Sequence, residues 1–254
     1  EEAGVLLGCA PDTVLGAGAQ TARRSIARGD IGVPASAHTA FVGPGPERWH
    51  PNPAFLFAAG AGPLLDMGPY YVTTLVSILG PVARVAAVGT RARATRVVAS
   101  GPLAGTSFPV EVPTHVEVLL EFEEGGASHS TLSADAPAER PPLVEVTGSE
   151  GLLRVPDPNR FDGTVQLLPA GGSTWIERPA EGAAHGRGLG VLDLARALRA
   201  GGVARADGEL GFHVLDVLLA AEESIAEGRF AGVESTARAP ELLPEGWDPG
   251  AASL

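Results

Sequence analysis

The sequence lacks several features that define whole classes of protein. It contains no lysine, so arginine carries all 18 positive charges, and this chain can form no lysine Schiff base. Its single cysteine, Cys9, excludes an intramolecular disulfide framework and indicates a reducing compartment. The first residues show no signal-peptide pattern, and no apolar run approaches the roughly 18 residues of a membrane span. We therefore expect a cytoplasmic protein.

Positive charge is scarce relative to negative charge. The 30 acidic residues outnumber the 18 basic ones, which gives a formal net charge of −12. Such a chain repels nucleic acid and anionic membranes, because binding to either depends on neutralising phosphate. The six histidines show no metal-ligand spacing, and no Gly-x-Ser-x-Gly motif occurs. We therefore expect a small-molecule or protein partner, no nucleic acid, no membrane and no catalytic metal.

Hydrophobic periodicity predicts the order of the secondary structure. The apolar run 5–10 is typical of a buried strand, followed by a helix over 15–28 and a strand over 31–42. A helix is predicted over 66–81, with Pro69 at its first position, an apolar stripe and an opposite polar stripe that Tyr70 heads. Strands are then expected over 82–98, 116–122, 128–133, 143–147, 151–155, 164–168 and 173–178, and helices over 191–199 and 210–227.

This order predicts an α+β fold, with an open, mostly antiparallel β-sheet and helices packed on one face. Consecutive strands joined by short turns pair antiparallel, and helices grouped at the two ends of a sequence can cover one face of the sheet. The uncovered face would be costly to leave in water, so we expect a homo-oligomer formed through the sheet face. The Pro- and Gly-rich segment 237–254 is expected to be an extension along the surface.

A glycine-rich segment over 16–21, GAGAQT, imitates a dinucleotide fingerprint. It follows a predicted strand and opens a predicted helix, as such a fingerprint does. However, Thr21 stands at the third glycine, and Asp30 comes too early to be the acidic residue that binds a ribose. We therefore interpret the segment as a glycine-tolerant first helical turn packed close to its neighbour.

Asp66 and Tyr70 are the candidates for catalysis. They are four residues apart around a predicted helix start, so their side chains can approach the same side of the helix. A phenol there can donate or accept a proton, or orient a hydroxyl-bearing substrate. A structural alternative stays open, in which Asp66 is favoured by the helix dipole and Tyr70 is an amphipathic boundary residue.

Five further side chains are candidates for substrate binding. Arg48, Trp49 and His50 lie together in a loop rich in Gly and Pro, where aromatic and polar groups can stack on or hydrogen-bond to a sugar. His115, at the start of a predicted strand, and Arg187 are the other two. For His50 and His115 the alternative of an ordinary exposed histidine stays open.

Several segments together resemble the Gfo/Idh/MocA oxidoreductases, the family of glucose–fructose oxidoreductase and inositol dehydrogenase. The matching segments cover nearly the whole chain. They are GCAPDTVLGAGAQTARRSIARGDIGVP (8–34), GAGPLLDMGPYYVTTLVSILGPV (60–82), FPVEVPTHVEVLLEFEEG (108–125), VEVTGSEGLLRVPDPNRFDG (144–163) and RGLGVLDLARAL (187–198).

The resemblance implies a two-domain dehydrogenase of which this chain is the C-terminal half. It assigns 1–30 to the end of a dinucleotide-binding domain with its linking helix, and 31–236 to a domain for substrate binding and oligomerisation. The cofactor, NAD or NADP, would then be bound mainly by an N-terminal Rossmann domain whose pattern, together with its Glu-Lys-Pro motif, is absent here. The family commonly has an Asp and, four residues later, a His at the helix that faces the nicotinamide. Here these positions are Asp66 and Tyr70.

The function that follows is an oxidoreductase that transfers a hydride between a nicotinamide cofactor and a sugar- or polyol-like substrate. A piece without its cofactor domain is expected to be inactive alone. The alternative is a non-catalytic sugar-binding or dimerisation module derived from such an enzyme, which the tyrosine in place of histidine favours.

Overall fold

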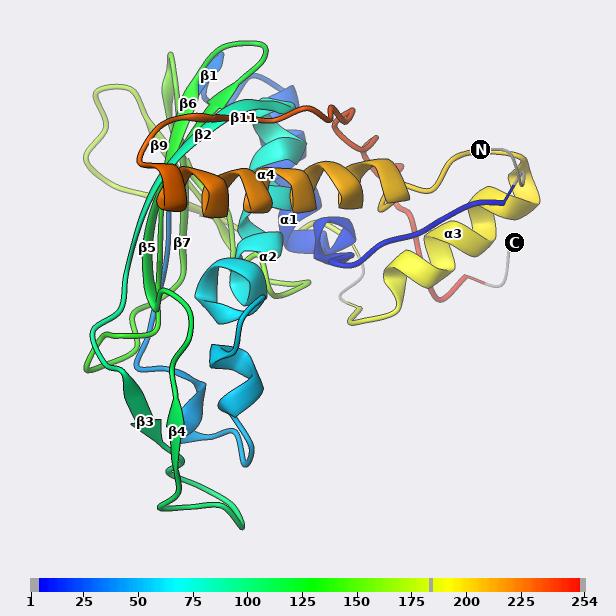
Figure 1. Cartoon of the computed structure of the whole chain (residues 1–254). Coiled ribbons are helices and arrows are strands. Elements are labelled where there is room, and N and C mark those ends of the chain that lie inside the picture. Colours follow the sequence, from blue (N-terminus) through cyan, green and yellow to red (C-terminus); the bar gives the residue numbers. More distant parts are fainter. Residues whose placement is uncertain (1–4, 183–184, 252–254) are drawn as a thin grey trace.

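A nine-stranded open sheet dominates the computed structural model, which describes residues 5–182 and 185–251 (Figure 1). The strands lie in the order β10-β9-β8-β7-β1-β6-β5-β2-β11, and β3 and β4 form a separate small sheet. Only β1 and β6 pair parallel among the described strands. The strands are β1 Pro34–Val42, β2 Val82–Thr90, β3 Thr95–Val97, β4 Ser107–Pro109, β5 His115–Phe122, β6 Ala127–Ser133, β7 Leu143–Gly148, β8 Gly151–Arg154, β9 Val165–Pro169, β10 Ile176–Arg178 and β11 Ala231–Gly232.

Helices cover one face of this sheet (Figure 1). The helix α2 packs on β1, β5 and β6, while α4 packs on β2 and on α2. The helices are α1 Ala17–Ala27, α2 Gly62–Leu79, α3 Leu189–Ala200 and α4 Gly208–Glu227, with 3-10 turns at Thr13–Leu15, Pro46–Arg48 and Ala54–Phe57. The predicted fold class, an open and mostly antiparallel sheet with helices on one face, is therefore confirmed.

Alternation of burial along the strands shows which face belongs to the core. In β5, Val116, Val118, Leu120 and Phe122 are buried in the main core, and the residues between them are half-buried or exposed. Burying each such side chain stabilises the fold by about 1.5–3 kcal/mol. The sheet therefore has one face sealed by helices and one face open.

The helix α2 begins earlier than its sequence predicts. It starts at Gly62, whose φ of 88° favours glycine, and Pro63 occupies its first turn, where a missing N–H costs nothing. Pro69 lies inside the helix and is not its first residue. In the predicted polar stripe, Thr73 and Thr74 are buried. Each hydroxyl donates a hydrogen bond to a carbonyl four residues back in the same helix, at 2.6 and 2.9 Å, and is thereby satisfied inside the core.

Two strand predictions are wrong in part. The segment 5–10 is exposed and forms only an isolated bridge between Gly8 and Asp207, because no strand of the described sheet lies beside it. Its Val5 side chain is 74% exposed. The predicted strand 82–98 is divided after Thr90, since the chain there leaves the large sheet to form the β3–β4 pair.

The C-terminal segment lies along α1, as an extension over the surface would. Gln20 accepts a hydrogen bond from the Leu243 N–H at 2.8 Å, and Arg24 donates one to the Leu243 carbonyl at 3.0 Å. Among the described helices, none combines the length and apolarity that a bilayer crossing demands.

Candidate functional site

A cavity of about 260 Å³ lies where the end of β1 and the loop after it meet the first turns of α2. Most of its wall is apolar, with Leu56, Phe57 and Met67 among the residues that line it. Its polar side chains are few and come from different elements, namely Asp66, Glu139, Arg140 and Asn159. An apolar hollow with a few convergent polar groups is the usual form of a small-molecule site.

Asp66 is the acidic group that α2 contributes to this cavity. It lies in the second turn of the helix, and its carboxyl remains accessible to solvent at the cavity. The protein atoms around it raise its pKa above the usual range by partial desolvation. A carboxyl of this kind can exchange a proton with a bound hydroxyl or carbonyl group.

Tyr70 does not share the cavity with Asp66. It lies one turn further along α2, is half-buried, and packs against the main core, outside the set of residues that line the cavity. Its neighbour Tyr71 is fully buried and donates a hydrogen bond to the Ala40 carbonyl at 3.4 Å, and burial raises its pKa. Asp66 and Tyr70 therefore lie on adjacent turns of α2, as their spacing predicted, but they do not line the same cavity.

The loop after β1 brings Trp49 to the rim of the cavity, where its indole is 70% exposed. His50 lies beside it, with the two rings edge to face at 5.5 Å, and its Nδ1 accepts a hydrogen bond from the Asn52 N–H at 3.1 Å. Arg48 is exposed, and its nearest polar partner is the Pro137 carbonyl at 3.5 Å. Of this group, Trp49 alone lines the cavity.

The other two substrate-side candidates differ in position. The Arg187 guanidinium donates a hydrogen bond to the Asn159 side chain at 2.9 Å, so it reaches the cavity through a residue that lines it. His115 lies on the open face of the sheet, where its ring contacts Glu117 at 3.1 Å. The structure therefore brings Asp66, Trp49 and indirectly Arg187 together, and leaves His115 apart.

Sequence reasoning missed three polar residues of the cavity. Glu139 and Arg140 lie in a Pro-rich loop, and no spacing in the sequence connects that loop with α2. Asn159 had a local signal, because it follows Asp157-Pro158 in a turn where its N–H bonds the Asp157 carboxylate at 2.9 Å. A turn of this type indicates a fixed loop but not the cavity that the loop faces.

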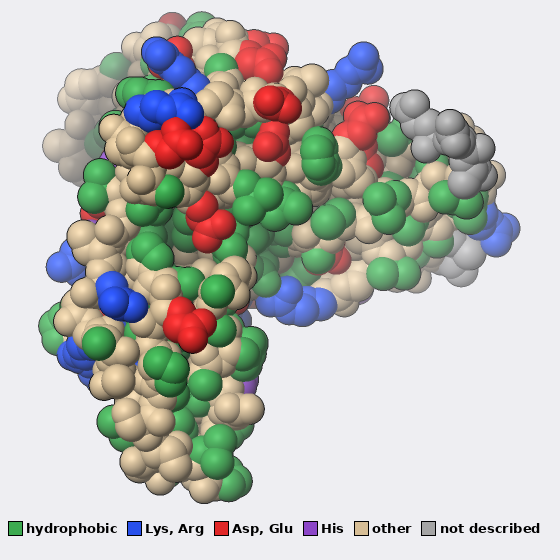
Figure 2. All heavy atoms as spheres, in the orientation of Figure 1, with side chains coloured by type: hydrophobic (Ala, Val, Ile, Leu, Met, Phe, Trp, Pro, Cys, Tyr) green, Lys and Arg blue, Asp and Glu red, His purple; other side chains and the backbone are tan. Residues whose placement is uncertain are grey.

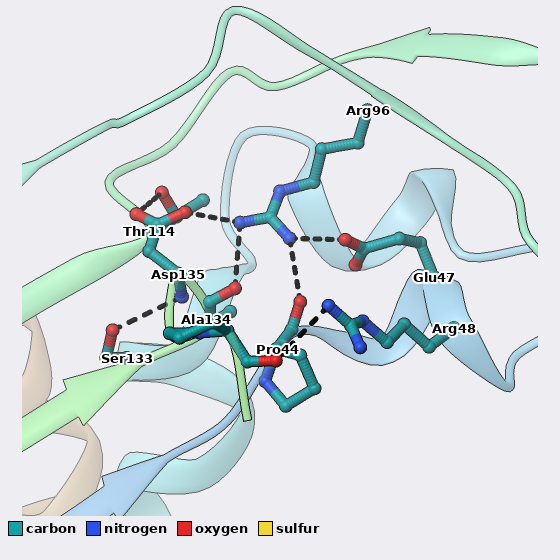
Figure 3. A network of polar contacts seen from close by, with 9 residues as sticks. Pro44, Glu47, Arg48, Arg96, Thr114, Ser133, Ala134 and Asp135 are labelled. Atoms are coloured by element: carbon teal, nitrogen blue, oxygen red, sulfur yellow. Dashed lines mark hydrogen bonds and ion pairs between the residues drawn. The ribbon is translucent and has the colours of Figure 1, made fainter. Parts of the chain in front are cut away.

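Behind one wall of the cavity lies a buried ionic network centred on Arg96 (Figure 3). The Arg96 side chain is 1% exposed and contacts both Glu47 and Asp135 at 2.5 Å. It also donates a hydrogen bond to the Ala134 carbonyl at 2.8 Å, and its guanidinium lies over the Phe57 ring at 4.8 Å. Ala134 and Phe57 both line the cavity.

The glycine-rich segment at the start of α1 is confirmed as a packing motif. A Cβ at Gly16 would lie 2.5 Å from the Phe161 backbone, and one at Gly18 would lie 2.4 Å from the Asp162 carbonyl oxygen. The Gly18 N–H also bonds the Phe161 carbonyl at 3.1 Å. The backbone of 161–162 therefore fills the space that a dinucleotide phosphate would need. Across the described chain, no three His, Cys, Asp or Glu side chains are placed to hold a metal ion.

The fold is that of the C-terminal domain of an oxidoreductase family. The family model described as the GFO/IDH/MocA C-terminal domain matches residues 19–154, which is more than half of the chain. The chain therefore belongs to the Gfo/Idh/MocA family, as the sequence resemblance indicated. No curated protein matches the chain in sequence.

Solved structures share this fold. Levoglucosan dehydrogenase in complex with NADH and levoglucosan is 21% identical, with a TM-score of 0.71 over 91% of this chain and 67% of that one. An NAD binding oxidoreductase from Klebsiella pneumoniae is 24% identical, with a TM-score of 0.69 over 87% and 64%. The WlbA dehydrogenase from Bordetella pertussis, in complex with NADH and UDP-GlcNAcA, is 19% identical, with a TM-score of 0.67 over 91% and 64%. The chain spans 64% of the length of levoglucosan dehydrogenase in its apo form.

Proposed function

We propose that this chain forms the substrate-binding half of an enzyme that transfers a hydride between a nicotinamide cofactor, NAD or NADP, and a sugar- or polyol-like substrate. The observation that carries the proposal is the position of Asp66. By the sequence resemblance it corresponds to the aspartate that the family commonly has, and in this structure it lines the cavity and has a pKa raised by desolvation. The solved structures of similar fold support the cofactor class, because several contain NADH.

The residues of this chain fit the substrate better than the cofactor. The phosphates of a dinucleotide find no room at 16–21, where the backbone of 161–162 lies against Gly16 and Gly18. The cavity, in contrast, has the size and the mixed lining of a site for a small hydroxylated molecule. The cofactor, when bound, supplies or accepts the hydride, and we assign its binding mainly to a separate nucleotide-binding domain.

Each candidate side chain has a distinct task. Asp66 orients the reacting oxygen and exchanges its proton, and Trp49 offers an exposed indole face on which a sugar ring stacks. Tyr70 serves as a second proton donor, which requires its side chain to turn from the core toward the first turns of α2. Arg187 acts through Asn159. Arg48 and His50 support the rim, whereas His115 lies on the open face of the sheet and does not line the cavity.

Exposed apolar side chains support the presence of a further domain in the working enzyme. Phe212 on α4 is 63% exposed, and Val191 and Leu198 on α3 are exposed to a similar degree. Figure 2 shows hydrophobic side chains spread over α4 and α3 on one side of the molecule. Contiguous apolar surface of this kind marks an interaction site. We therefore propose that a nucleotide-binding domain packs here, and that the chain alone is inactive.

The open face of the sheet supports self-association. Val88 and Leu119 lie there and are 65% and 49% exposed, with Arg84 and Glu121 paired at 2.6 Å beside them. Two copies that bury this face against each other would remove its apolar side chains from water. We propose a homo-oligomer formed through this face, which sedimentation of the chain at several concentrations would reveal.

The proposed function is tested in two steps. Calorimetric titration of the chain with NADH and NADPH is expected to show no binding, because the described glycine motif has no room for a phosphate. The chain is then joined to a nucleotide-binding domain of the family and supplied with NAD⁺ or NADP⁺ and a panel of sugars. Sugar-dependent formation of reduced nicotinamide, lost in Asp66→Asn, is the expected result. Tight nucleotide binding by the chain alone would contradict the account.

A non-catalytic sugar-binding module is the second candidate. The observation that favours it is Tyr70, which stands where the family commonly has histidine and packs against the core. Its unperturbed pKa of about 10 makes a tyrosine a weaker base near neutrality than a histidine. Equal sugar affinity in wild type and Asp66→Asn, with no turnover by the two-domain protein, would support this second candidate.

A further inference from the structure

The buried network around Arg96 joins two parts of the chain beside the cavity (Figure 3). Glu47 belongs to the short turn Pro46–Arg48, which directly precedes Trp49. Asp135 follows β6 and belongs to the sheet side, where Thr114 donates a hydrogen bond to its second oxygen at 2.6 Å. Arg96 bonds both carboxylates, one with each terminal nitrogen of its guanidinium.

The contacts of the first terminal nitrogen all go to the loop. Arg96 Nη1 bonds the Glu47 carboxylate at 2.5 Å and the Pro44 carbonyl at 3.2 Å. The Glu47 carbonyl in turn accepts a hydrogen bond from the Ala99 N–H at 2.9 Å. The loop that carries Trp49 is therefore fixed at Pro44 and Glu47 against β3, which carries Arg96, and against the segment that follows β3.

The contacts of the second terminal nitrogen all go to the sheet side. Arg96 Nη2 bonds Asp135 at 2.5 Å and the Ala134 carbonyl at 2.8 Å. Burying one guanidinium with two carboxylates is expensive, and such a group stabilises a fold less than apolar packing of equal volume does. Its use is geometric, because a planar guanidinium holds two carboxylates in a fixed relative position.

We propose that Arg96 and Glu47 form a loop clamp that positions Trp49 for substrate binding, a role that rests on the proposed function. The ion pair between Arg96 and Glu47 holds the loop in place two residues before Trp49. Neither side chain lines the cavity, so both act as positioning residues. Asp135 anchors Arg96 to the sheet side and does not touch the loop.

The test compares two matched substitutions, Glu47→Gln and Asp135→Asn. Each removes one negative charge and one ion pair from the same guanidinium, and each leaves one carboxylate opposite one arginine. Exchange of single backbone amides with solvent is measured by NMR. The His50 N–H, bonded to the Pro46 carbonyl at 2.8 Å, reports on the loop, and the Ala134 N–H, bonded to the Thr114 carbonyl at 2.8 Å, reports on the sheet side.

We expect Glu47→Gln to accelerate exchange at His50 about tenfold relative to Ala134, and to weaken the affinity for levoglucosan or L-sorbose about tenfold in calorimetry. Asp135→Asn is expected to accelerate exchange at Ala134 and to leave both His50 and the sugar affinity close to wild type. If both variants change both amides and the affinity equally, the network is a purely structural ion pair and the clamp is wrong.

Sugar binding and amide exchange distinguish a failure of the proposed function from a failure of the loop clamp. If no sugar binds even the wild type, the proposed function fails, whereas the two amides still decide whether Glu47 holds the loop. Should Glu47→Gln not fold, Glu47→Asp keeps the charge and withdraws the carboxylate by one methylene, and the same selective loosening at His50 is expected. Equal loosening at Ala134 in that variant would overturn the clamp.

Discussion

His213 Nε2 accepts a hydrogen bond from the backbone N–H of Val82 at 3.0 Å, which connects the second turn of α4 to the first residue of β2. The imidazole is fully buried, and its Nδ1 lies 3.0 Å from the Ser235 hydroxyl. Because Nε2 must keep its lone pair for the Val82 N–H, the ring is neutral with its proton on Nδ1. Burial lowers the pKa of His213, although Asp216 and Glu123 act in the opposite direction.

The chain should lose stability in mild acid through His213. A histidine whose pKa is lower in the folded than in the unfolded state stabilises the fold above the unfolded value of about 6.5. That contribution is lost as the pH falls from there toward the lowered folded value, since protonation breaks the bond to Val82. Melting temperatures measured between neutral and mildly acidic pH should therefore fall in wild type and fall less in His213→Gln. The exposed His38→Gln is the control, and identical pH slopes in all three proteins would refute this role.

The close approach at the first turn of α1 predicts a steric penalty. In Gly18→Ala the new Cβ would lie 2.4 Å from the Asp162 carbonyl oxygen, so the helix or the loop must shift. We expect this substitution to lower the free energy of unfolding by about 1–3 kcal/mol. In Gly232→Ala, by contrast, no atom lies within 4 Å of the new Cβ, and stability should stay within about 0.5 kcal/mol. Urea denaturation measures the free energy of unfolding of both variants. Equal stabilities would show that the backbone of 161–162 moves aside at little cost.

Asp66→Asn should strongly reduce turnover while leaving the fold intact. The side chain is accessible to solvent, so its loss costs little stability, but an amide cannot exchange the proton of the reacting oxygen. We expect kcat of the two-domain enzyme to fall by about 10²–10⁴-fold. In wild type, sugar oxidation should rise with pH as the Asp66 carboxyl, with its raised pKa, ionises. Glu121→Gln on the open sheet face is the control, and an equal loss of kcat there would point to a general effect of charge.

Tyr70→Phe separates the catalytic from the structural alternative for this residue. Phenylalanine preserves the packing against the main core and removes only the hydroxyl. If Tyr70 donates a proton, kcat should fall by about 10²-fold with unchanged melting temperature and sugar affinity. Unchanged kcat would leave Asp66 as the sole proton-transfer group of this chain and reduce Tyr70 to a boundary residue of α2.

Local patterns in the sequence predicted the fold well. The alternation over 116–122, the Gly125-Gly126 turn and the strand after it indicated β5 and β6, which pair antiparallel as expected. The helices α1, α3 and α4 lie where apolar periodicity and terminal glycines placed them. These features depend on neighbours in sequence, and for that reason a single sequence contains them.

Features that depend on distant partners could not be predicted. The parallel pairing of β1 with β6 joins residues about 90 positions apart, as in Thr39 and Ser130. The strand-like segment 5–10 has the right composition but no described strand beside it. The same reason applies to the cavity, because Asp66 and Trp49 had local signals in the sequence, whereas Glu139 and Arg140 line the cavity only through tertiary contacts.

Hydrogen–deuterium exchange of the chain with and without saturating levoglucosan, L-sorbose and other sugars tests the central claim most directly. The account predicts that one or more sugars protect the amides of 41–49 and 62–67, which surround the cavity, and that NADH protects nothing at 16–21. Protection confined to the open sheet face, protection at 16–21 by NADH, or no protection by any sugar would contradict it.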